Sequence, residues 1–369
     1  MDKHRVRISW LSARYTHFAF VLYNLSIVME KEHLLGKTLE ELQAVAEENG
    51  LPRFAAKQIA SWLYEKRIDH IAGMSNLSLK HRELLSRRYD IGREAPVQSL
   101  RSTDGTIKYL FRVGGDDFVE TVYIPDRDRA TLCVSSQVGC KMNCSFCMTG
   151  KQGFKRSLSS AEIINQILSV EYSDKLTNLV FMGMGEPFDN LDEVMRALSV
   201  LTSEWGFAWS PKRITVSTIG HLNGIRRFLD ESRCHLAVSL HSPFPEERLR
   251  IMPVEKAFPM TDVLDLLRRR DFSHQRRLSF EYILFNGYND SLDHADALAR
   301  LLKGMDCRVN LIRFHAIPGV TLKSTDMQSM EAFRDRLNNR GVVATIRASR
   351  GEDIFAACGM LSTAEKNKK

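Results

Sequence analysis

Three cysteines lie within one short segment, Cys140-Lys-Met-Asn-Cys144-Ser-Phe-Cys147. Chance would place roughly 0.003 such triples in a chain of this length and cysteine content. Three thiolates at this spacing fit a metal or iron–sulfur centre. A structural zinc ion needs a fourth ligand, and none of residues 148–220 is Cys or His. Three thiolates on a four-iron cluster leave one iron open to a substrate, which favours a catalytic centre.

Two further groups of residues follow predicted strands. In Gly183-Met-Gly185-Glu186-Pro187, the glycines allow the backbone to approach a ligand closely, and Glu186 can accept a hydrogen bond from an ammonium group or a ribose. Ser217 ends the next strand, and Ser239-Leu240-His241 ends the one after it, where cofactor contacts are expected. Each of these residues alone is also typical of an ordinary turn.

A carboxylate interrupts an otherwise apolar strand face. Glu120 shares one face with Phe118, Val122 and Ile124 by the two-residue period of a strand. Such a carboxylate protects a sheet edge, or it is a partly buried base with a raised pKa. The sequence leaves both interpretations open.

These residues need a scaffold that brings them to one edge of a sheet. From about residue 127, strand and helix patterns alternate, which predicts a parallel sheet, open or curled into a barrel. Catalytic groups in such folds lie at the carboxyl ends of the strands. The predicted strands are Thr131–Ser135, Thr177–Met182, Arg213–Ser217, His235–Leu240, Leu278–Leu284, Val309–Arg313 and Val342–Ile346. The predicted helices are Ala161–Tyr172, Leu191–Leu201, Val263–Arg270, Leu292–Lys303 and Met327–Asn339.

The chain before this core has a different character. Helices are predicted after the capping box Thr38-Leu-Glu-Glu41, over about residues 52–67, and over about residues 78–89. Their many basic residues form a solvated face or contact RNA. Strands are predicted at Val97–Arg101, Thr106–Arg112 and Phe118–Ile124, joined by glycine turns. We therefore expect an extension at 1–28, a helical accessory domain at 29–95, a small antiparallel extension at 96–126, a core at 127–361 and a tail at 362–369.

Composition limits the class of protein. The 369 residues include 52 Lys+Arg and 45 Asp+Glu, a net charge of +7, and 44% hydrophobic residues. These values are ordinary for a globular chain and exclude a disordered or disulfide-scaffold protein. Seven cysteines without a clear secretion signal favour the reducing cytoplasm. The apolar run 18–29 is too short to span a bilayer, and we expect Met29 to be the true start.

The cysteine spacing resembles that of the radical S-adenosylmethionine superfamily. More specifically, Glu120–Pro125, Arg129–Cys140, Gly183–Pro187 and Ala357-Cys358-Gly359 resemble the RlmN branch of the RlmN/Cfr RNA methyltransferases. The resemblance covers about residues 35–361. It implies an α/β fold with a partial (β/α)6 radical SAM barrel, a small antiparallel β extension and an N-terminal helical domain. It also implies a [4Fe-4S] cluster on Cys140, Cys144 and Cys147.

The resemblance assigns roles to further residues. Two molecules of S-adenosylmethionine serve each turnover: one methylates Cys358, and the other generates a radical that removes hydrogen from the S-methyl group. The methylene radical adds to C2 of an adenosine, Glu120 is the candidate base for the C2 proton, and Cys133 resolves the adduct by forming a disulfide. Gly185, Glu186, Ser217, Ser239, Leu240 and His241 are the expected cofactor contacts. His315 is another, although many relatives have Asn at that position. Cys234 and Cys307 match no family role and are expected in the core.

The resemblance also implies partners. The RNA substrates would be 23S ribosomal RNA and transfer RNA, and an external donor such as flavodoxin or ferredoxin would supply electrons. We expect a cytoplasmic monomer with no membrane contact. One alternative is a Cfr-like enzyme that methylates C8 of adenosine with the same cysteines. An alternative of another class is a non-catalytic RNA-binding protein with a structural metal site, although such a protein has no use for Cys133 and Cys358.

Overall fold

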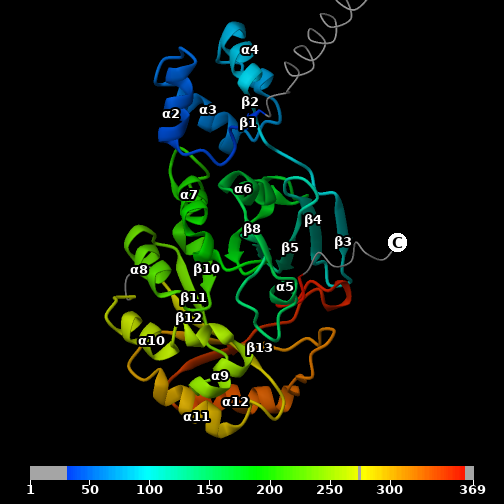
Figure 1. Ribbon diagram of the computed structural model, residues 1–369, viewed down its shortest axis with the longest axis vertical. Helices are drawn as coiled ribbons and strands as arrows, with labels where there is room; N and C mark the ends of the chain where they lie inside the picture. Colours follow the sequence, from blue (N-terminus) through cyan, green and yellow to red (C-terminus); the bar gives the residue numbers. More distant parts are fainter. Residues whose placement is uncertain (1–30, 273–275, 362–369) are drawn as a thin grey trace, which may run out of the picture.

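The computed structural model describes residues 31–272 and 276–361 (Figure 1). The predicted N-terminal extension, the start at Met29 and the C-terminal tail lie outside these ranges. No helix in the described ranges is long and apolar enough to cross a bilayer.

The N-terminal part contains short helices between two short strands, and these two strands pair with each other in parallel. The elements are β1 (Glu32–His33), α2 (Leu39–Glu48), α3 (Ala55–Ala60), a π-helical turn (Ser61–Glu65), a 3-10 turn (Ile71–Gly73), α4 (Leu79–Arg88) and β2 (Tyr89–Asp90). The capping box of Thr38 and Glu41 begins α2 as predicted. The helix predicted over 52–67 is shorter and changes to π-helical geometry at Ser61.

This N-terminal part packs on the rest of the chain through an aromatic side chain. The Tyr64 ring lies 6.1 Å from the Trp205 ring and 5.9 Å from the Phe207 ring, measured between ring centroids. Tyr64 is 1% exposed. A second contact joins the two parts where the Ser160 hydroxyl donates to the Gly36 carbonyl at 3.0 Å. Figure 1 shows these helices at one end of the molecule, above α6 and α7.

One ten-stranded sheet runs through the rest of the protein, in the order β14-β13-β12-β11-β10-β9-β6-β5-β4-β3. The strands β3 (Gln98–Arg101), β4 (Ile107–Arg112), β5 (Phe118–Asp126) and β6 (Arg129–Cys133) pair antiparallel. The others run parallel to β6: β9 (Asn178–Phe181), β10 (Ile214–Thr218), β11 (His235–Ser239), β12 (Leu278–Leu284), β13 (Arg308–Arg313) and β14 (Val343–Ile346). The predicted antiparallel extension thus continues the core sheet.

Helices connect the parallel strands, as expected for repeated βα units. They are α6 (Ser160–Leu168), α7 (Leu191–Thr202), α8 (Leu222–Glu231), α9 (Pro245–Ile251), α10 (Met260–Arg268), α11 (Leu292–Leu301) and α12 (Met327–Asn339). Short 3-10 turns lie at Ser173–Lys175, Pro187–Asn190, Pro211–Arg213, Pro253–Lys256 and Glu352–Ile354. A small hairpin of β7 (Gln137–Gly139) and β8 (Phe154–Ser157) encloses the four-residue helix α5 (Met148–Lys151). Because their polar faces weakened the pattern, α8 and α9 were not among the predicted helices.

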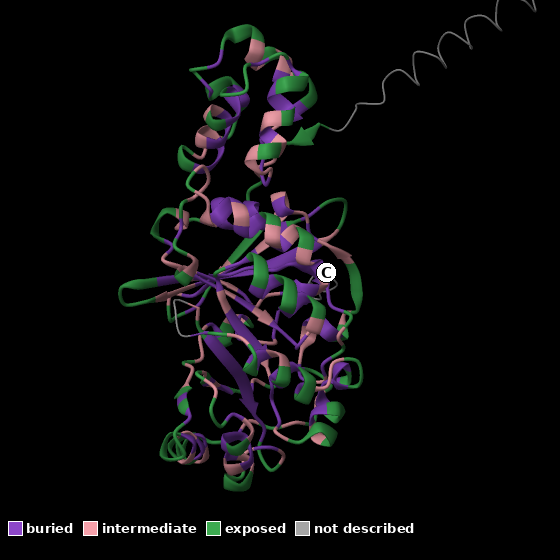
Figure 2. Ribbon diagram, turned by 90° about the vertical axis from the view of Figure 1, so that its left-hand side faces the viewer, coloured by how far each residue is buried: buried purple, intermediate pink, exposed green. Residues whose placement is uncertain are grey.

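The core lies between the sheet and its helices. Figure 2 shows the central strands of the sheet mostly buried, whereas edge strands such as β3 are exposed and the surrounding helices alternate between buried and exposed residues. A second apolar cluster lies apart from this core, around the cysteine loop, and includes Cys144, Phe146, Met252, Phe285 and Phe314. The predicted α/β class is confirmed by the alternation of parallel strands and helices in the core.

Candidate active site

Backbone hydrogen bonds hold the loop that carries the three clustered cysteines. The Cys140 N–H donates to the Gly153 carbonyl at 3.0 Å, which closes the loop against β8. The Met148 N–H donates to the Gly359 carbonyl at 2.8 Å. This second bond ties the cysteine loop to the C-terminal segment that carries Cys358.

A cavity opens at the carboxyl ends of the parallel strands. Nine of the residues singled out from the sequence line it: Cys140, Cys144, Cys147, Gly185, Glu186, Ser217, Ser239, His241 and Cys358. Fold topology therefore brings together segments more than two hundred residues apart. The second apolar cluster surrounds the cavity and lowers the local dielectric constant.

The clustered thiols are suited to a metal-containing group. Burial raises the pKa of Cys140 to about 12 and raises the pKa of Cys144 well above the usual value. These thiols therefore keep their protons at neutral pH unless a cation displaces them. No group of three or more Cys, His, Asp or Glu in the described ranges is arranged around a point for a single metal ion. The donor set, three thiols and no fourth ligand, suits an iron–sulfur cluster with one open position.

The Glu186 carboxylate accepts three hydrogen bonds from neighbouring groups of the protein. One carboxylate oxygen accepts from the Thr218 hydroxyl at 2.6 Å and from the Phe188 N–H at 3.1 Å, and the other accepts from the Ile219 N–H at 3.0 Å. Burial raises the Glu186 pKa to about 7. Gly185 has a φ of 98°, and a Cβ there would lie 2.5 Å from the Gln137 Cβ. Glu186 thus fixes the cavity wall and retains acceptor capacity on one oxygen.

The ends of β10 and β11 supply polar groups to the same cavity. Ser217 and Ser239 are half-buried and line it. His241 is buried at a φ of 58°, and its Nδ1 accepts from the Ile283 N–H at 3.0 Å. Burial lowers the His241 pKa to about 3, so the ring is neutral. Leu240, expected beside them, is completely buried and does not line the cavity.

A buried arginine orders the two loops that follow β10 and β11. The Arg248 guanidinium donates to the carbonyls of Ile219 at 2.7 Å, Ser239 at 3.1 Å and Leu240 at 3.1 Å, and it forms an ion pair with Glu255. These contacts hold the loop backbones in the positions that expose Ser239 and His241 to the cavity. Sequence analysis missed Arg248, because α9 was not predicted.

The cavity wall contains an unpartnered carboxylate oxygen. Glu281 is 3% exposed, and its Oε1 accepts from the Asn310 amide at 2.7 Å. In the described part of the chain, its Oε2 is buried without a hydrogen-bond partner. Leaving such a group unsatisfied costs about 1–3 kcal/mol. An amino or hydroxyl group of S-adenosylmethionine would satisfy it, so the cavity residues fit that cofactor.

Two more cysteines converge on an arginine beside the cavity. Cys133 ends β6, Cys358 lies in the C-terminal segment, and Arg347 follows β14. Arg347 and Cys358 both line the cavity, whereas Cys133 is buried behind it. The charge of Cys358 is the largest cause that raises the Arg347 pKa, and Cys133 adds to it. Burial first, and then the charge of Cys358, raise the Cys133 pKa to about 12.

Glu120 lies near Cys133 and has a partner that sequence analysis missed. The sheet register pairs Cys133 with Val122, so Glu120, two residues along β5, is a diagonal neighbour of Cys133 on the same face. Glu120 Oε1 lies 3.0 Å from Lys108 Nζ, and both side chains are 5% exposed. Glu120 is therefore part of a buried ion pair.

His315 lies away from the other predicted cofactor contacts. It does not line the cavity, and its Nδ1 lies 3.5 Å from a carboxylate oxygen of Glu352. Burial lowers its pKa. The structure therefore assigns His315 to the loop after β13 and not to the cavity wall.

All seven cysteines are free, including Cys133 and Cys358. The disulfide implied by the family resemblance is not present. Cys234 is buried as expected, whereas Cys307 is only half-buried.

Arg347 and Glu281 are the main cavity residues that sequence analysis did not assign. Arg347 follows the predicted strand Val342–Ile346 and lines the cavity. The sequence did contain an indication for Glu281. Like Glu120, it is a carboxylate within an otherwise apolar strand, Leu278–Leu284, and such a carboxylate is often functional. The register places Glu281 beside Ser239 on one side and Asn310 on the other.

The sequence matches two family profiles. Residues 134–302 match the radical SAM superfamily, and residues 32–91 match the ribosomal RNA large subunit methyltransferase N-terminal domain.

Individual relatives match almost the whole chain. The probable dual-specificity RNA methyltransferase RlmN of Phocaeicola vulgatus is 63% identical over 339 residues, which cover 92% of this chain and 97% of that protein. The dual-specificity RNA methyltransferase RlmN of Geotalea uraniireducens is 41% identical over 333 residues, covering 90% of this chain and 97% of that protein. The crystal structure of a radical SAM methyltransferase from Sphaerobacter thermophilus superposes with a TM-score of 0.84 at 39% identity, covering 89% of this chain and 98% of that one.

Proposed function

Because the chain belongs to the RlmN family of radical SAM RNA methyltransferases, we propose that it methylates C2 of adenosine in RNA through a methyl group carried on Cys358. The substrates on this proposal are 23S ribosomal RNA and transfer RNA. One observation carries it: Cys358 and Cys133 converge on Arg347 beside a cavity lined by three further cysteines. A structural metal site would need only the last three.

Cys140, Cys144 and Cys147 would hold a [4Fe-4S] cluster, and Glu281, Ser217, Ser239 and His241 line the space for S-adenosylmethionine. When bound, these groups supply a methyl group in one step and a 5′-deoxyadenosyl radical in another, so two S-adenosylmethionine molecules serve each turnover. The remaining chemistry falls to side chains of this chain.

Cys358 first acts as a nucleophile. Its thiol loses a proton, and the sulfur attacks the methyl carbon that S-adenosylmethionine would supply; the Cys358 sulfur becomes an S-methyl thioether and S-adenosylhomocysteine leaves. Arg347 and Cys358 both line the cavity, so a positive charge lies on the same cavity wall as this sulfur. Loss of one hydrogen atom then leaves a methylene radical on the Cys358 sulfur.

The methylene carbon then bonds to C2 of the adenine, a carbon too electron-poor to attack a methyl cation itself. The adduct gives up the C2 proton and one electron, and the oxidised cluster that Cys140, Cys144 and Cys147 would hold is the acceptor available for that electron. We assign the proton to Glu120, whose ion pair with Lys108 keeps a carboxylate on the face shared with Cys133.

Cys133 completes the turnover. Its sulfur attacks the Cys358 sulfur, the carbon–sulfur bond breaks, and the released carbon takes a proton to become the methyl group of the product. The two sulfurs are left as a disulfide, which a thiol reductant must reduce with two electrons. The free cysteines of the structure correspond to the reduced state before this step.

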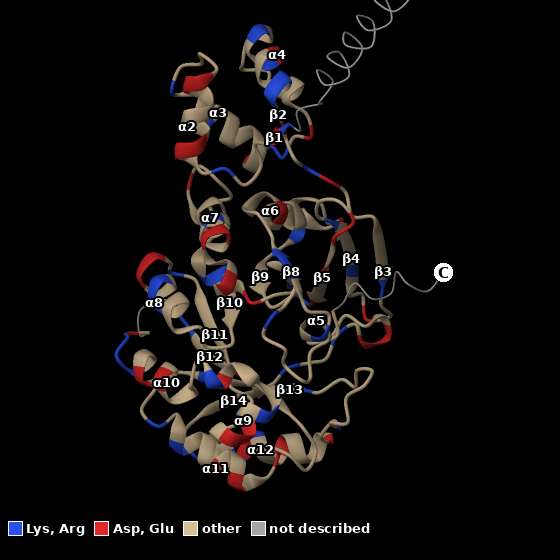
Figure 3. Cartoon of the chain, in the orientation of Figure 1, with Lys and Arg blue, Asp and Glu red and all other residues tan. Residues whose placement is uncertain are grey.

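The proposal includes partners. An electron donor of the flavodoxin or ferredoxin type would reduce the cluster, and we propose a monomer that works in the cytoplasm. Charged residues on the N-terminal helices, visible in Figure 3, are the proposed RNA contacts of that part.

The test is to identify the methylated carbon. RNA incubated with anaerobically reconstituted, reduced protein should yield 2-methyladenosine, separated chromatographically from the 8-methyl isomer. The 8-methyl product would favour the Cfr-like alternative. A colourless protein that neither binds iron nor cleaves S-adenosylmethionine would favour a non-catalytic RNA-binding protein.

A further inference from the structure

A second cavity lies at the opposite, amino-terminal end of the parallel strands. Its volume is about 530 Å³, within the range of small-molecule sites. Strand β10 contributes Thr215 to it and Ser217 to the active-site cavity, so the two cavities face opposite ends of the same sheet. No step of the proposed reaction uses the residues of this second cavity.

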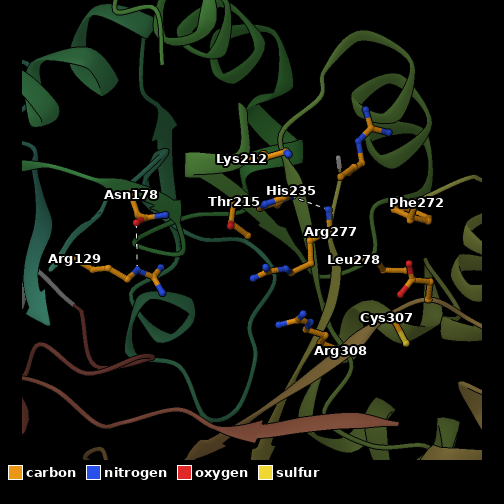
Figure 4. Close-up of a pocket in the computed structure, with 12 residues that line it drawn as sticks. Arg129, Asn178, Lys212, Thr215, His235, Phe272, Arg277, Leu278, Cys307 and Arg308 are labelled. Carbon is orange, nitrogen blue, oxygen red and sulfur yellow. Dashed lines mark hydrogen bonds between the residues drawn. The ribbon is translucent and has the colours of Figure 1, made fainter. Parts of the chain in front are cut away.

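Positive charge dominates the walls. Five cationic side chains line the cavity, namely Arg129, Lys212, Arg276, Arg277 and Arg308, against one carboxylate, Asp306. Within residues 31–272 and 276–361, none of the five forms an ion pair, although most other arginines in those ranges do. Figure 4 shows the guanidinium groups of Arg277 and Arg308 directed toward the side of the cavity where Arg129 lies.

One of these arginines is incompletely satisfied. Arg276 donates from Nη1 to the Leu229 carbonyl at 3.1 Å. Its Nε and Nη2 are buried and lack a hydrogen-bond partner in the described part of the chain. Burial of a charged donor without an acceptor is costly, so these atoms call for an anion or another acceptor.

The charges in the cavity also repel one another. Burial lowers the Arg277 pKa, and the charges of Arg308 and Arg129 lower it further. Burial and then the charges of Arg277, Lys212 and Arg276 lower the pKa of His235 to about 4. These side chains thus form a concentrated positive field with almost no acidic counterpart.

We propose that this cavity binds a ligand through its phosphate groups. Arginine forks match phosphate oxygens in pairs, and several cations around one space suit a polyanion better than a single carboxylate. Two sources share this chemistry: a phosphodiester segment of the RNA substrate, and a free phosphate compound of nucleotide size. Either one would neutralise the cationic side chains that line the cavity.

The first experiment measures binding of inorganic pyrophosphate to the full chain. Pyrophosphate should raise the melting temperature above that in chloride of equal ionic strength. The variant Arg277→Gln/Arg308→Gln should weaken this binding at least tenfold. The control Arg300→Gln/Lys303→Gln removes two exposed cations from α11 and the loop after it, outside the cavity, and should bind as the wild type does.

The second experiment identifies the source of the phosphate. RNA binding is measured against salt concentration with the same variants. If RNA phosphates occupy the cavity, the slope of log K against log[salt] should fall by about 1–2 in the cavity variant and not in the control. An unchanged slope with lost pyrophosphate binding assigns the cavity to a free phosphate compound.

Two results would overturn the proposal. One is wild-type protein that is no more stabilised by pyrophosphate than by chloride and has an RNA salt slope equal to that of the cavity variant. The other is a control variant that loses as much binding as the cavity variant. Neither readout requires methylation, so failure of the proposed reaction would leave this test intact.

Discussion

Arg347 connects the two cysteines that the proposed reaction consumes and restores. Its position beside Cys358, Cys133 and Glu281 makes it the electrostatic centre of the site. Replacing it with glutamine removes the charge while keeping a polar side chain. Comparing this variant with the wild type therefore measures the effect of the Arg347 charge on Cys358.

We expect the Arg347→Gln variant to methylate its Cys358 roughly tenfold more slowly at neutral pH. This corresponds to an activation free energy higher by about 1.4 kcal/mol. The reason is that the developing thiolate loses its cation. Intact-protein mass spectrometry over time measures the rate.

Arg350→Gln is the matched control, since Arg350 lies three residues away and pairs with Asp126 at 3.1 Å, outside the cavity. It should methylate Cys358 at the wild-type rate. Equal rates for Arg347→Gln and Arg350→Gln would refute the role of Arg347.

His241 makes stability depend on pH. Its folded-state pKa of about 3 lies below the ordinary 6.5. The neutral ring therefore contributes stability that is complete above pH 6.5 and is lost as pH falls toward 3. Between pH 6.5 and 5.5 protonation of this residue in the unfolded chain should lower the stability of the wild type by about 1 kcal/mol.

The variant His241→Asn should lack that loss, because an amide oxygen can accept from the Ile283 N–H without titrating. Asn also tolerates the positive φ. Urea unfolding at several pH values compares the two proteins. Parallel pH profiles would show that His241 does not titrate as described.

At this scale, the sequence indicated the cysteines and not their environment. The spacing of Cys140, Cys144 and Cys147 is a local pattern, so it could be recognised directly. The contacts of Arg347 with two cysteines depend on how distant segments meet, and no local pattern predicts that. The position of His315 beside Glu352 also depends on how distant segments meet, so the sequence did not predict it.

At the scale of elements, the hairpin of β7 and β8 determines where the cysteine loop begins. Gly139 and Gly153 both have positive φ, at 75° and 73°. A Cβ on Gly139 would lie 1.8 Å from the Gly153 carbonyl oxygen, whereas a Cβ on Gly153 would meet nothing within 4 Å. The two glycines therefore differ only in the space around them.

Gly153→Ala should cost about 1–2 kcal/mol from backbone strain alone. Gly139→Ala should cost more and should lower the iron bound per chain after reconstitution, because the clash opens the loop next to Cys140. Urea unfolding and iron analysis measure both effects. Equal stability and equal iron content in the two variants would contradict this account of the hairpin.

The core strands could be predicted from their apolar runs, and Leu278–Leu284 has the predicted bounds because every residue in it is buried. The helices α8 and α9 were missed, since both are short and each contains four charged residues. The change from α3 to a π-helical turn at Ser61 was not predicted either, and Tyr64, which contacts Trp205 and Phe207, lies in that turn.

At the scale of the whole molecule, Tyr64 joins the N-terminal helices to the rest of the chain. Tyr64→Ala should destabilise this junction by about 3–5 kcal/mol, because it removes the ring from Trp205 and Phe207. Limited proteolysis should then cut residues 31–95 while the sheet stays intact.

Tyr64→Phe keeps the ring and removes only the hydrogen bond from the hydroxyl to the Lys37 carbonyl, at 2.7 Å. It should cost about 1 kcal/mol and leave the proteolysis pattern unchanged. Equal protease sensitivity in both variants would mean that the ring does not hold the junction.

The net charge of +7 predicted little about where anions bind. Figure 3 shows Lys and Arg residues spread over the N-terminal helices and the core. What concentrates charge is the register of the parallel strands, which brings the amino ends of β6 and β10–β13 to one cavity. The net charge alone could not predict that these basic side chains meet in one cavity.

The central claim is that the methyl group travels through Cys358 and loses one hydrogen on the way. Mass spectrometry of adenosine from RNA methylated with trideuteromethyl S-adenosylmethionine tests it directly. The account predicts 2-methyladenosine whose new methyl group retains two deuterium atoms. Three retained deuterium atoms would mean direct transfer of an intact methyl group and would contradict the account.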